Sequence, residues 1–257
     1  MAICGAPALR RLAGGALTVM TTTHQAGSSG QKRVVIVGAT GMVGGYALRY
    51  ALQNPAVGHV TSIGRRKLGL SHPKLAEVLH PDFADCSSLA EVLSDQDAVI
   101  FCLGAYTGTV TDAELRRITV DYTVEFARVL HGSSPDVAFS FLSGSGADPT
   151  GRSRIPFARY KGEAEKALLT EGFPRVYIFR PAYIYPVVPR KEPNFSYRLL
   201  RRIYPVFRAL FPNQVIRADD LARAMVEAVV RGADRREDLV LENRDIRTMS
   251  ESRHSAD

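Results

Sequence analysis

Three evenly spaced glycines, Gly38, Gly41 and Gly44, form the first pattern in the sequence that points to chemistry. They follow an unbroken β-branched run, residues 34–37, and precede an apolar stripe at helical spacing. In a strand–turn–helix, such glycines make the tight turn, admit a pyrophosphate to the backbone and let the helix pack on the strand. The N–H groups and the positive dipole end of the helix then attract phosphates. The pattern predicts a dinucleotide site. Its turn also contains Thr40, Met42 and Val43.

Two arginines, Arg65 and Arg66, follow the next expected strand, residues 59–63. In NAD enzymes of this architecture, an acidic side chain near this point binds the ribose hydroxyls. A carboxylate would repel a 2′-phosphate, whereas an arginine holds it through two charge-assisted hydrogen bonds. The position therefore favours NADP(H) over NAD(H). The alternative is a solvated basic turn.

Two further stretches are candidates for cofactor contacts. Asp82 is placed to accept a hydrogen bond from an adenine amino group with Phe83 packed beside the ring, although a plain loop aspartate fits nearly as well. Leu103 and Gly104 end a later core strand, where a glycine lets the cofactor lie against the backbone.

The elements that position these residues alternate along the chain. Alternating strands and helices predict an α/β fold, a Rossmann-type doubly wound parallel sheet with right-handed crossovers. Besides the first two, we expect strands at residues 75–79, 98–102, 137–142 and 175–179 and an edge strand at 239–241. We expect helices at residues 87–93 with a serine cap, 111–130 closed by Gly132, 158–171 and 219–230.

These elements predict a single domain over residues 32–248, with a disordered tail at 249–257. An insert around residues 187–214 breaks the alternation and is expected to form a small C-terminal lobe that caps the substrate cleft. The alternative is an amphipathic surface helix that touches a membrane or a protein partner.

Composition narrows the function classes. The 257-residue chain has a net charge of +7, which suits an anionic ligand but is dilute, so nucleic acid is not expected. No apolar run approaches the ~18 residues of a membrane span, and membrane association is not expected. The three cysteines and six histidines show no metal-ligand spacing, so we predict no metal.

The first 31 residues contain no acid and are expected to be a disordered leader, or to precede a later start at Met20. We therefore expect a cytoplasmic protein. A mitochondrial presequence, which would also be arginine-containing and acid-free, is the alternative.

Motifs in order along residues 33 to about 246 resemble the short-chain dehydrogenase/reductase superfamily, in its extended or atypical NAD(P)-binding branch. More narrowly, they resemble the Tat-interacting-protein-like oxidoreductases. The matching stretches are Gly38-Ala-Thr-Gly-Met-Val-Gly44, Ile63-Gly-Arg-Arg-Lys-Leu68, Cys102-Leu-Gly104, Val120-Asp-Tyr122, Leu142-Ser143, Gly146-Ala-Asp148, Lys161-Gly-Glu163, Arg180-Pro181 and Leu241-Glu-Asn243.

The resemblance implies a catalytic serine at a strand end, and a tyrosine four residues before a lysine on one helix face. The lysine would hold the nicotinamide ribose and lower the pKa of the tyrosine. Lys161 and Ser143 occupy two of these positions, but the position four before Lys161 is Phe157. The neighbouring Tyr160 is the available phenol and is the third catalytic candidate with Ser143 and Lys161. It points about 100° away around the helix from Lys161 and so cannot simply take over the role.

The serine itself is ambiguous, because in related proteins the working hydroxyl lies one or two residues further, here at Gly144 or Ser145. Pro181, in a matching stretch, and Tyr183 are further candidates for cofactor contacts. Tyr183 and Tyr185 fit equally well as core aromatics or as substrate contacts.

Three hypotheses follow. The first is an NADP(H)-dependent oxidoreductase of a small, unidentified carbonyl or alcohol, whose proton comes from water, from Ser143 or Ser145, or from a phenol of the cap region such as Tyr183. The second is a non-catalytic NADP(H)-binding protein that reports redox state to a partner. The third, a sugar-nucleotide epimerase or dehydratase, is weaker because those enzymes use the tyrosine. A monomer and a homodimer fit the sequence equally.

Overall fold

A seven-stranded parallel sheet forms the centre of the molecule. In the computed structural model, which describes residues 30–105, 108–188, 210–230 and 237–251, strand β1 (Lys32–Val37) lies between β2 (Val57–Gly64) and β4 (Ala98–Phe101). The remaining strands are β3 (Leu75–Leu79), β5 (Ala138–Leu142), β6 (Arg175–Arg180) and β9 (Glu237–Glu242). Their order, β3-β2-β1-β4-β5-β6-β9, reverses direction between β1 and β4, where such sheets bind ligands beyond the carboxyl ends of the strands.

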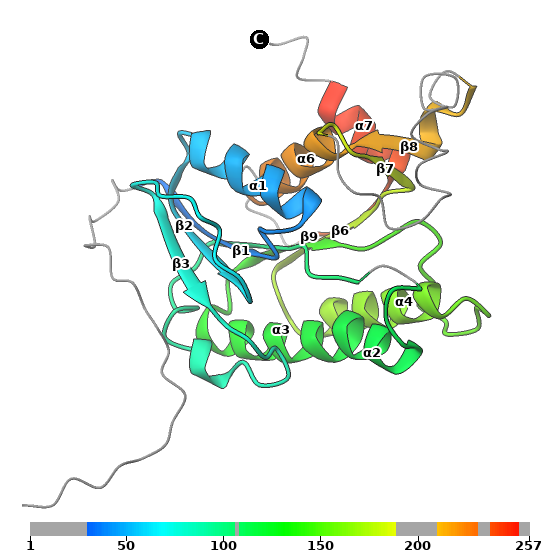
Figure 1. Cartoon of the computed structure of the whole chain (residues 1–257), viewed down its shortest axis with the longest axis horizontal. Coiled ribbons are helices and arrows are strands. Elements are labelled where there is room, and N and C mark those ends of the chain that lie inside the picture. The colour runs from blue at the N-terminus through cyan, green and yellow to red at the C-terminus, as the bar shows by residue number, and fades with distance from the viewer. Residues whose placement is uncertain (1–29, 106–107, 189–209, 231–236, 252–257) are drawn as a thin grey trace, which may run out of the picture.

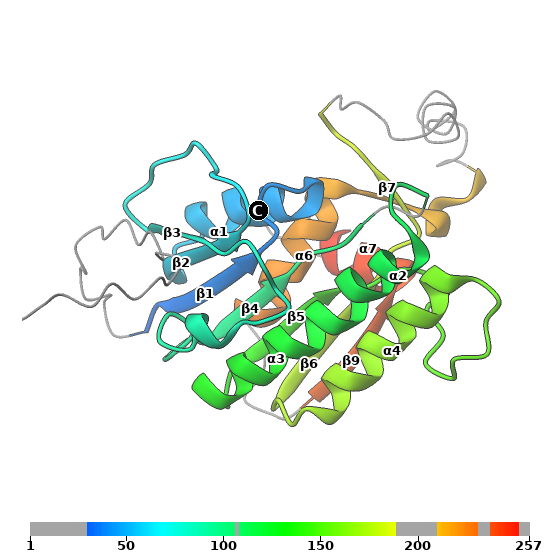
Figure 2. The same ribbon diagram turned by 60° about the horizontal axis from the view of Figure 1, so that its bottom comes forward.

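Helices cover both faces of the sheet (Figures 1 and 2). Helices α1 (Met42–Gln53), α6 (Ala218–Val230) and α7 (Asn243–Glu251) lie on one face. Helices α3 (Tyr122–Ser133) and α4 (Pro156–Thr170) lie on the other. Strand β1 explains why the sheet needs two layers: Val34 and Ile36 are fully buried in the first core, and Val35 and Val37 in the second. The α/β doubly wound prediction is confirmed.

The expected helix at residues 111–130 is not continuous. It divides into α2 (Asp112–Arg116), a π-helical turn η2 (Arg117–Asp121) and α3, which runs past Gly132 to Ser133. The Thr123 hydroxyl, in the first turn of α3, donates to the Thr119 carbonyl of the π-helical turn at 2.8 Å. An extra residue in one turn shifts the buried stripe around the axis. Leu115 and Val120 can therefore pack with Tyr160 on α4 while Phe126 packs under the sheet.

The expected helix at residues 87–93 is also shorter than predicted. It is a single 3₁₀ turn, η1 (Ser87–Leu89), and Ser87 does not cap it. Asp85 takes that role, because its carboxylate accepts the Ser87 backbone N–H at 2.9 Å. Leu89 and Leu93 are fully buried, which confirms the apolar pattern although not the helical length.

The C-terminal lobe is described only in part. Strands β7 (Tyr183–Tyr185) and β8 (Val215–Arg217) form a separate two-stranded parallel sheet, preceded at β8 by the 3₁₀ turn η3 (Pro212–Gln214). Residues 189–209, which contain most of the predicted cap insert, lie outside the described residues, as do 1–29 of the predicted leader. Gln31, which we assigned to that leader, already bonds the Pro55 carbonyl at 2.8 Å.

The predicted disordered tail begins too early. Helix α7 continues to Glu251, and only residues 252–257 lie outside the described chain. The helix forms because Ile246 is fully buried against the first core with Met249 packed beside it. The edge strand predicted at residues 239–241 is confirmed as β9, parallel to β6.

Candidate cofactor and active site

The glycine turn between β1 and α1 is closely packed on neighbouring backbone. Gly38 has φ +85°, and a methyl group on it would lie 3.0 Å from the Cys102 carbonyl carbon at the end of β4. A methyl group on Gly44 would lie 2.3 Å from the Gly38 carbonyl oxygen. Only glycine allows these approaches. The turn therefore leaves a cradle of bare backbone at the start of α1.

The start of α1 favours an anion. Its N-cap, Gly41, offers no side-chain cap, and no acidic residue lies in the first turn. The N–H groups of a first helical turn have no partner within the helix. A phosphate is the natural acceptor for such groups, and the positive dipole end of the helix favours it.

The basic turn after β2 reaches this cradle. Arg65 and Arg66 are both exposed, and the Arg66 guanidinium donates to the Thr40 hydroxyl at 3.2 Å. The structure thereby brings Arg66 to the glycine turn. Arg65 makes no hydrogen bond or ion pair within the described chain.

The loop after β3 differs from the expectation for Phe83. The Phe83 side chain is 1% exposed and packs against His80, Tyr122 and Phe126, so its ring has no free face for adenine. That part of the prediction is wrong: the ring anchors the loop in the core. Asp82 is exposed, and one of its carboxylate oxygens accepts the Ala84 N–H at 3.0 Å.

The ends of β4 and β6 lie near the same edge of the sheet. Leu103 is half-buried, and Gly104 is exposed with open space where a side chain would be. Pro181 contributes its carbonyl, which accepts the Ser145 N–H at 2.8 Å. Tyr183 begins β7 and is half-buried.

Lys161 on α4 points its amine to the end of β5. Its side chain is buried, the Nζ atom donates to the Leu142 carbonyl at 2.7 Å, and it lies 4.7 Å from the centre of the Phe141 ring. Burial lowers the pKa of Lys161 to about 8, although the nearby Glu165 charge acts in the opposite direction. The amine is therefore held at the carboxyl edge of the sheet with its proton loosely bound.

Ser143 is engaged with a buried ion pair. Its hydroxyl bonds Glu165, which is 1% exposed and lies one helical turn after Lys161. Arg180 grips the same carboxylate through Nε at 3.0 Å and its terminal nitrogen at 2.5 Å, and also reaches Glu242 at 3.1 Å. The hydrogen bond to Glu165 raises the pKa of the Arg180 guanidinium further. The Ser143 hydroxyl is thus buried and already bonded to Glu165.

Ser145 has the free hydroxyl. Its side chain is exposed and makes no hydrogen bond within the described part of the chain. Between the two serines, Gly144 supports the ring of Phe157: a methyl group on Gly144 would lie 2.7 Å from the Phe157 Cζ atom. Of the open alternatives for the working serine, the geometry favours Ser145 over Ser143.

Tyr160 is not brought to Lys161. Its hydroxyl donates to Asp112 of α2 at 2.7 Å, and this hydrogen bond raises the pKa of the phenol. A catalytic tyrosine needs a lowered pKa. The prediction that Tyr160 is a catalytic residue is therefore corrected, because its hydroxyl binds Asp112 of α2 whereas the Lys161 amine binds the end of β5.

Three structural features were not anticipated from the sequence. Glu165 could have been found, because it lies four residues after Lys161 and so on the same helix face. Gly162 lets α4 touch the preceding loop, since a methyl group there would lie 2.0 Å from the Asp148 carbonyl carbon. Asn243 joins the lobe to the sheet by accepting the Ala182 N–H and donating to the Val215 carbonyl, both at 3.1 Å.

Within the described residues, no group of three potential metal ligands occurs. No described helix is long and apolar enough to cross a membrane.

The chain is similar in sequence to known NAD(P)H-binding and fungal proteins. The model of a family described as NAD(P)H-binding matches residues 38–231. Protein fmp52, mitochondrial, of Aspergillus clavatus is 30% identical over 76% of this chain and 86% of its own length. The Emericella nidulans protein of the same name is 31% identical, but the match covers 59% of this chain and 66% of that protein, just under two thirds. Rat HTATIP2 is 28% identical over 67% of this chain and 70% of its own length.

Solved structures share the fold. Gre2 of Candida albicans, in complex with NADPH, has a TM-score of 0.63 at 15% identity and covers 82% of this chain and 78% of its own. WbmH of Bordetella bronchiseptica, in complex with NAD+, has a TM-score of 0.61 at 18% identity, over 82% of this chain and 75% of its own.

Proposed function

Because this chain belongs to the NAD(P)H-binding family, we propose that it is an NADP(H)-dependent oxidoreductase of a small carbonyl or alcohol, with an active site that lacks the usual tyrosine. The observation that carries the proposal is the pairing of the bare glycine cradle with the buried Lys161 amine. Both lie at the carboxyl edge of one parallel sheet, on either side of the point where the strand order reverses.

The residues of the cradle fit the cofactor. Gly38, Gly41 and Gly44 would receive the pyrophosphate at the start of α1, and Gly104 would leave room for the chain of the dinucleotide. Arg66, bonded to Thr40, is placed to hold a 2′-phosphate with Arg65 beside it. This cationic turn is the reason for proposing NADP(H) rather than NAD(H).

The proton-transfer residues are Ser145 and Lys161. Bound nicotinamide supplies or accepts the hydride. As the hydride reaches the carbonyl carbon, the exposed Ser145 hydroxyl would give its proton to the carbonyl oxygen of the substrate and regain a proton from solvent. Lys161, whose pKa is lowered to about 8 by burial, would orient the ribose and exchange a proton at Nζ near neutral pH. Glu165 and Arg180 hold Ser143, and with it the end of β5, in place.

The alternative is a non-catalytic NADP(H)-binding protein that signals redox state to a partner. Phe157 and the Asp112-bound Tyr160 favour it, because no phenol of α4 is available for proton transfer. A protein that only binds the cofactor needs the cradle but does not need a catalytic tyrosine.

A turnover assay separates the two. We expect purified protein to oxidise NADPH in the presence of at least one compound in a panel of small aldehydes and ketones. Ser145→Ala should lower kcat about 10²-fold, the lower range for a general acid, with little change in cofactor affinity. Phe157→Tyr should raise kcat if its hydroxyl can rotate off Gly144. NADPH binding without turnover of any compound, by either the natural protein or Phe157→Tyr, would favour the regulatory alternative.

We make a separate proposal for the location of the protein in the cell. The fungal relatives are named as mitochondrial proteins, which favours the mitochondrial alternative for this chain over the cytoplasmic expectation. Fractionation of cells that express the full chain tests it: recovery in the mitochondrial fraction is expected, and recovery only in the cytosol would contradict it.

A further inference from the structure

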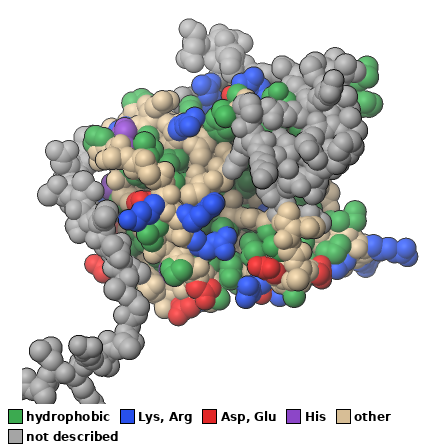
Figure 3. Space-filling model, in the orientation of Figure 1, with side chains coloured by type: hydrophobic (Ala, Val, Ile, Leu, Met, Phe, Trp, Pro, Cys, Tyr) green, Lys and Arg blue, Asp and Glu red, His purple; other side chains and the backbone are tan. Residues whose placement is uncertain are grey.

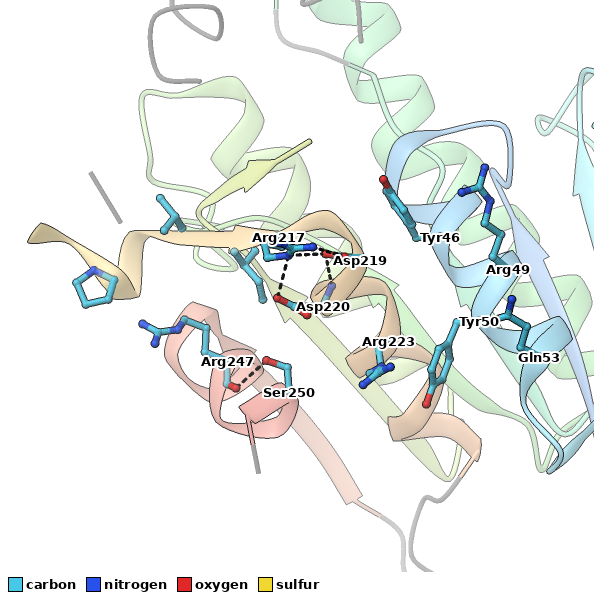
Figure 4. Close-up of a pocket in the computed structure, with 13 residues that line it drawn as sticks. Tyr46, Arg49, Tyr50, Gln53, Arg217, Asp219, Asp220, Arg223, Arg247 and Ser250 are labelled. Atoms are coloured by element: carbon cyan, nitrogen blue, oxygen red, sulfur yellow. Dashed lines mark hydrogen bonds and ion pairs between the residues drawn. The ribbon is translucent and has the colours of Figure 1, made fainter. Parts of the chain in front are cut away.

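A groove lies between α1, α6 and α7, on the helical layer opposite α3 and α4 (Figure 4). Its volume is about 710 Å³, within the usual ~300–1,000 Å³ of small-molecule sites. None of its lining residues belongs to the glycine turn, the basic turn after β2 or the Lys161 site. It is therefore separate from the cofactor and active site proposed above.

Two arginines on neighbouring helices line this groove. Arg49 on α1 stacks on Tyr46 at 5.9 Å, and Arg223 on α6 stacks on Tyr50 at 5.2 Å, measured from the guanidinium carbon to the ring centre. Within the described chain, neither guanidinium makes an ion pair or a hydrogen bond. Stacking fixes the plane of a guanidinium and leaves its N–H edge available.

The acids near these arginines are already engaged. Asp219 and Asp220 both pair with Arg217, at 2.7 Å and 3.6 Å, as Figure 4 shows. Glu227 lies one turn after Arg223, but its carboxylate accepts a hydrogen bond from the Tyr50 hydroxyl. Helix α1 itself contains no acidic residue. The positive charge of Arg49 and Arg223 is thus not neutralised by these carboxylates.

A buried hydroxyl provides an independent sign of a ligand. Tyr46 is one of the residues that line the groove, and its Oη atom is shielded from solvent and has no hydrogen-bond partner within the described residues. An unsatisfied buried hydroxyl costs about 1–3 kcal/mol, so a ligand oxygen that accepts this bond would bind more tightly.

The wider surface suits the same chemistry. On the face shown in Figure 3, several basic side chains gather over the middle of the molecule, whereas the visible acidic side chains lie mainly toward its lower rim. With a net charge of +7, the chain attracts anions at long range.

We propose that this groove binds a phosphate-bearing ligand of metabolite size, gripped by Arg49 and Arg223. Guanidinium groups pair with phosphate oxygens through two parallel hydrogen bonds, and two such groups suit a ligand with two phosphates or one diphosphate. The phosphate can belong to a soluble molecule or to a lipid headgroup. The groove would then be a second anion site beside the cofactor cradle.

The test is calorimetric titration of the full chain with inorganic pyrophosphate. The double variant Arg49→Gln/Arg223→Gln, which keeps the size of both side chains, should weaken binding about tenfold or more, as expected for losing charge-assisted hydrogen bonds. Arg65→Ala/Arg66→Ala controls for the cofactor cradle. Arg117→Ala is the matched control, because Arg117 also stacks on a tyrosine, Tyr122, at 5.9 Å.

A residue-resolved measurement keeps the test independent of folding. Pyrophosphate should slow modification of Arg49 and Arg223 by phenylglyoxal in the natural protein, read by peptide mass spectrometry, and leave Arg117 unprotected. Equal weakening in all three variants, or protection of none of these arginines, would overturn the proposal.

Vesicles of phosphatidylcholine with phosphatidic acid identify the source of the phosphate. If the protein floats with the vesicles, pyrophosphate reverses this flotation and the Arg49/Arg223 variant does not float, the phosphate belongs to a lipid headgroup. If the protein binds pyrophosphate but does not float, the ligand is a soluble molecule. Binding of neither, or of an acidic peptide alone, would contradict the proposal.

Discussion

The cofactor side and the proton-transfer side of the candidate site are built in different ways. The glycine turn presents bare backbone, closely packed between β1 and β4 and free of acidic charge. The other side presents side chains that bond one another: Ser143 with Glu165, Glu165 with Arg180, and Tyr160 with Asp112. Backbone geometry tolerates no change, whereas a side-chain network can be rearranged. We infer that this difference would let the proposed cofactor cradle persist while the proposed proton-transfer side changes.

The largest expected effects come from glycines, one on each side. Gly44→Ala would force a methyl group to 2.3 Å from the Gly38 carbonyl oxygen, and Gly162→Ala to 2.0 Å from the Asp148 carbonyl carbon. Each should lower the free energy of unfolding by about 3 kcal/mol or more. Chemical denaturation measures this loss.

The matched control is Gly132→Ala in α3, where the added methyl group meets nothing within 4 Å. It should stabilise the protein by up to about 1 kcal/mol, because alanine loses less entropy in a helix. If Gly44→Ala were as well tolerated as Gly132→Ala, the turn would not be closely packed.

The buried network gives the next largest effect. Glu165→Gln removes the charge that partners Arg180 and replaces one of the two acceptor oxygens, which serve Arg180 and Ser143, by a donor NH2 group. The change should cost about 3 kcal/mol of unfolding free energy. Glu163→Gln on the same helix is the control: its pair with Arg116 is nearly half exposed, and such pairs contribute at most about 1 kcal/mol. Equal losses in thermal denaturation would show that Glu165 has no special role.

Lys161 predicts a dependence on pH. Because its pKa falls from 10.5 to about 8 on folding, the unfolded chain binds more protons between these values, and this group stabilises the fold as pH rises through that range. Below about pH 8 the buried charge costs up to about 3 kcal/mol. Lys161→Met should therefore be the more stable protein near neutral pH, with an advantage that shrinks toward pH 10.5.

Denaturant unfolding of both proteins across this pH range measures the difference. An advantage of Lys161→Met that stayed constant with pH would contradict the lowered pKa. The variant also loses the hydrogen bond to Leu142, which lowers its stability equally at every pH. The lowered pKa is therefore tested by how the stability difference between the two proteins changes with pH.

Much of the fold was predictable because local pattern determines it. The unbroken apolar run at residues 34–37 predicts a strand buried on both faces, and both faces of β1 are indeed covered. The failures occur where tertiary contact overrides pattern. The apolar pattern of residues 111–130 does not reveal that a π-helical turn divides them. The sequence around Ile246 likewise does not reveal that burial of this residue in the core lets α7 continue to Glu251.

The site shows the same limit. Spacing identified the glycine turn and Lys161, but it could not show that Ser143 faces the buried Glu165 while Ser145 faces outward. It also could not show that Phe83 is enclosed by aromatic neighbours. These facts depend on residues far apart in the sequence.

The central claim is that an intact NADP(H) cradle accompanies an altered proton-transfer side. Titration of the full chain with NADPH and NADH, followed by nicotinamide fluorescence, tests it most directly when Arg66→Ala is measured beside the natural protein. We expect tighter binding of NADPH than of NADH, and about a tenfold loss for NADPH alone in the variant, as for one charge-assisted contact. Binding of neither nucleotide, or an equal loss for both, would contradict the account.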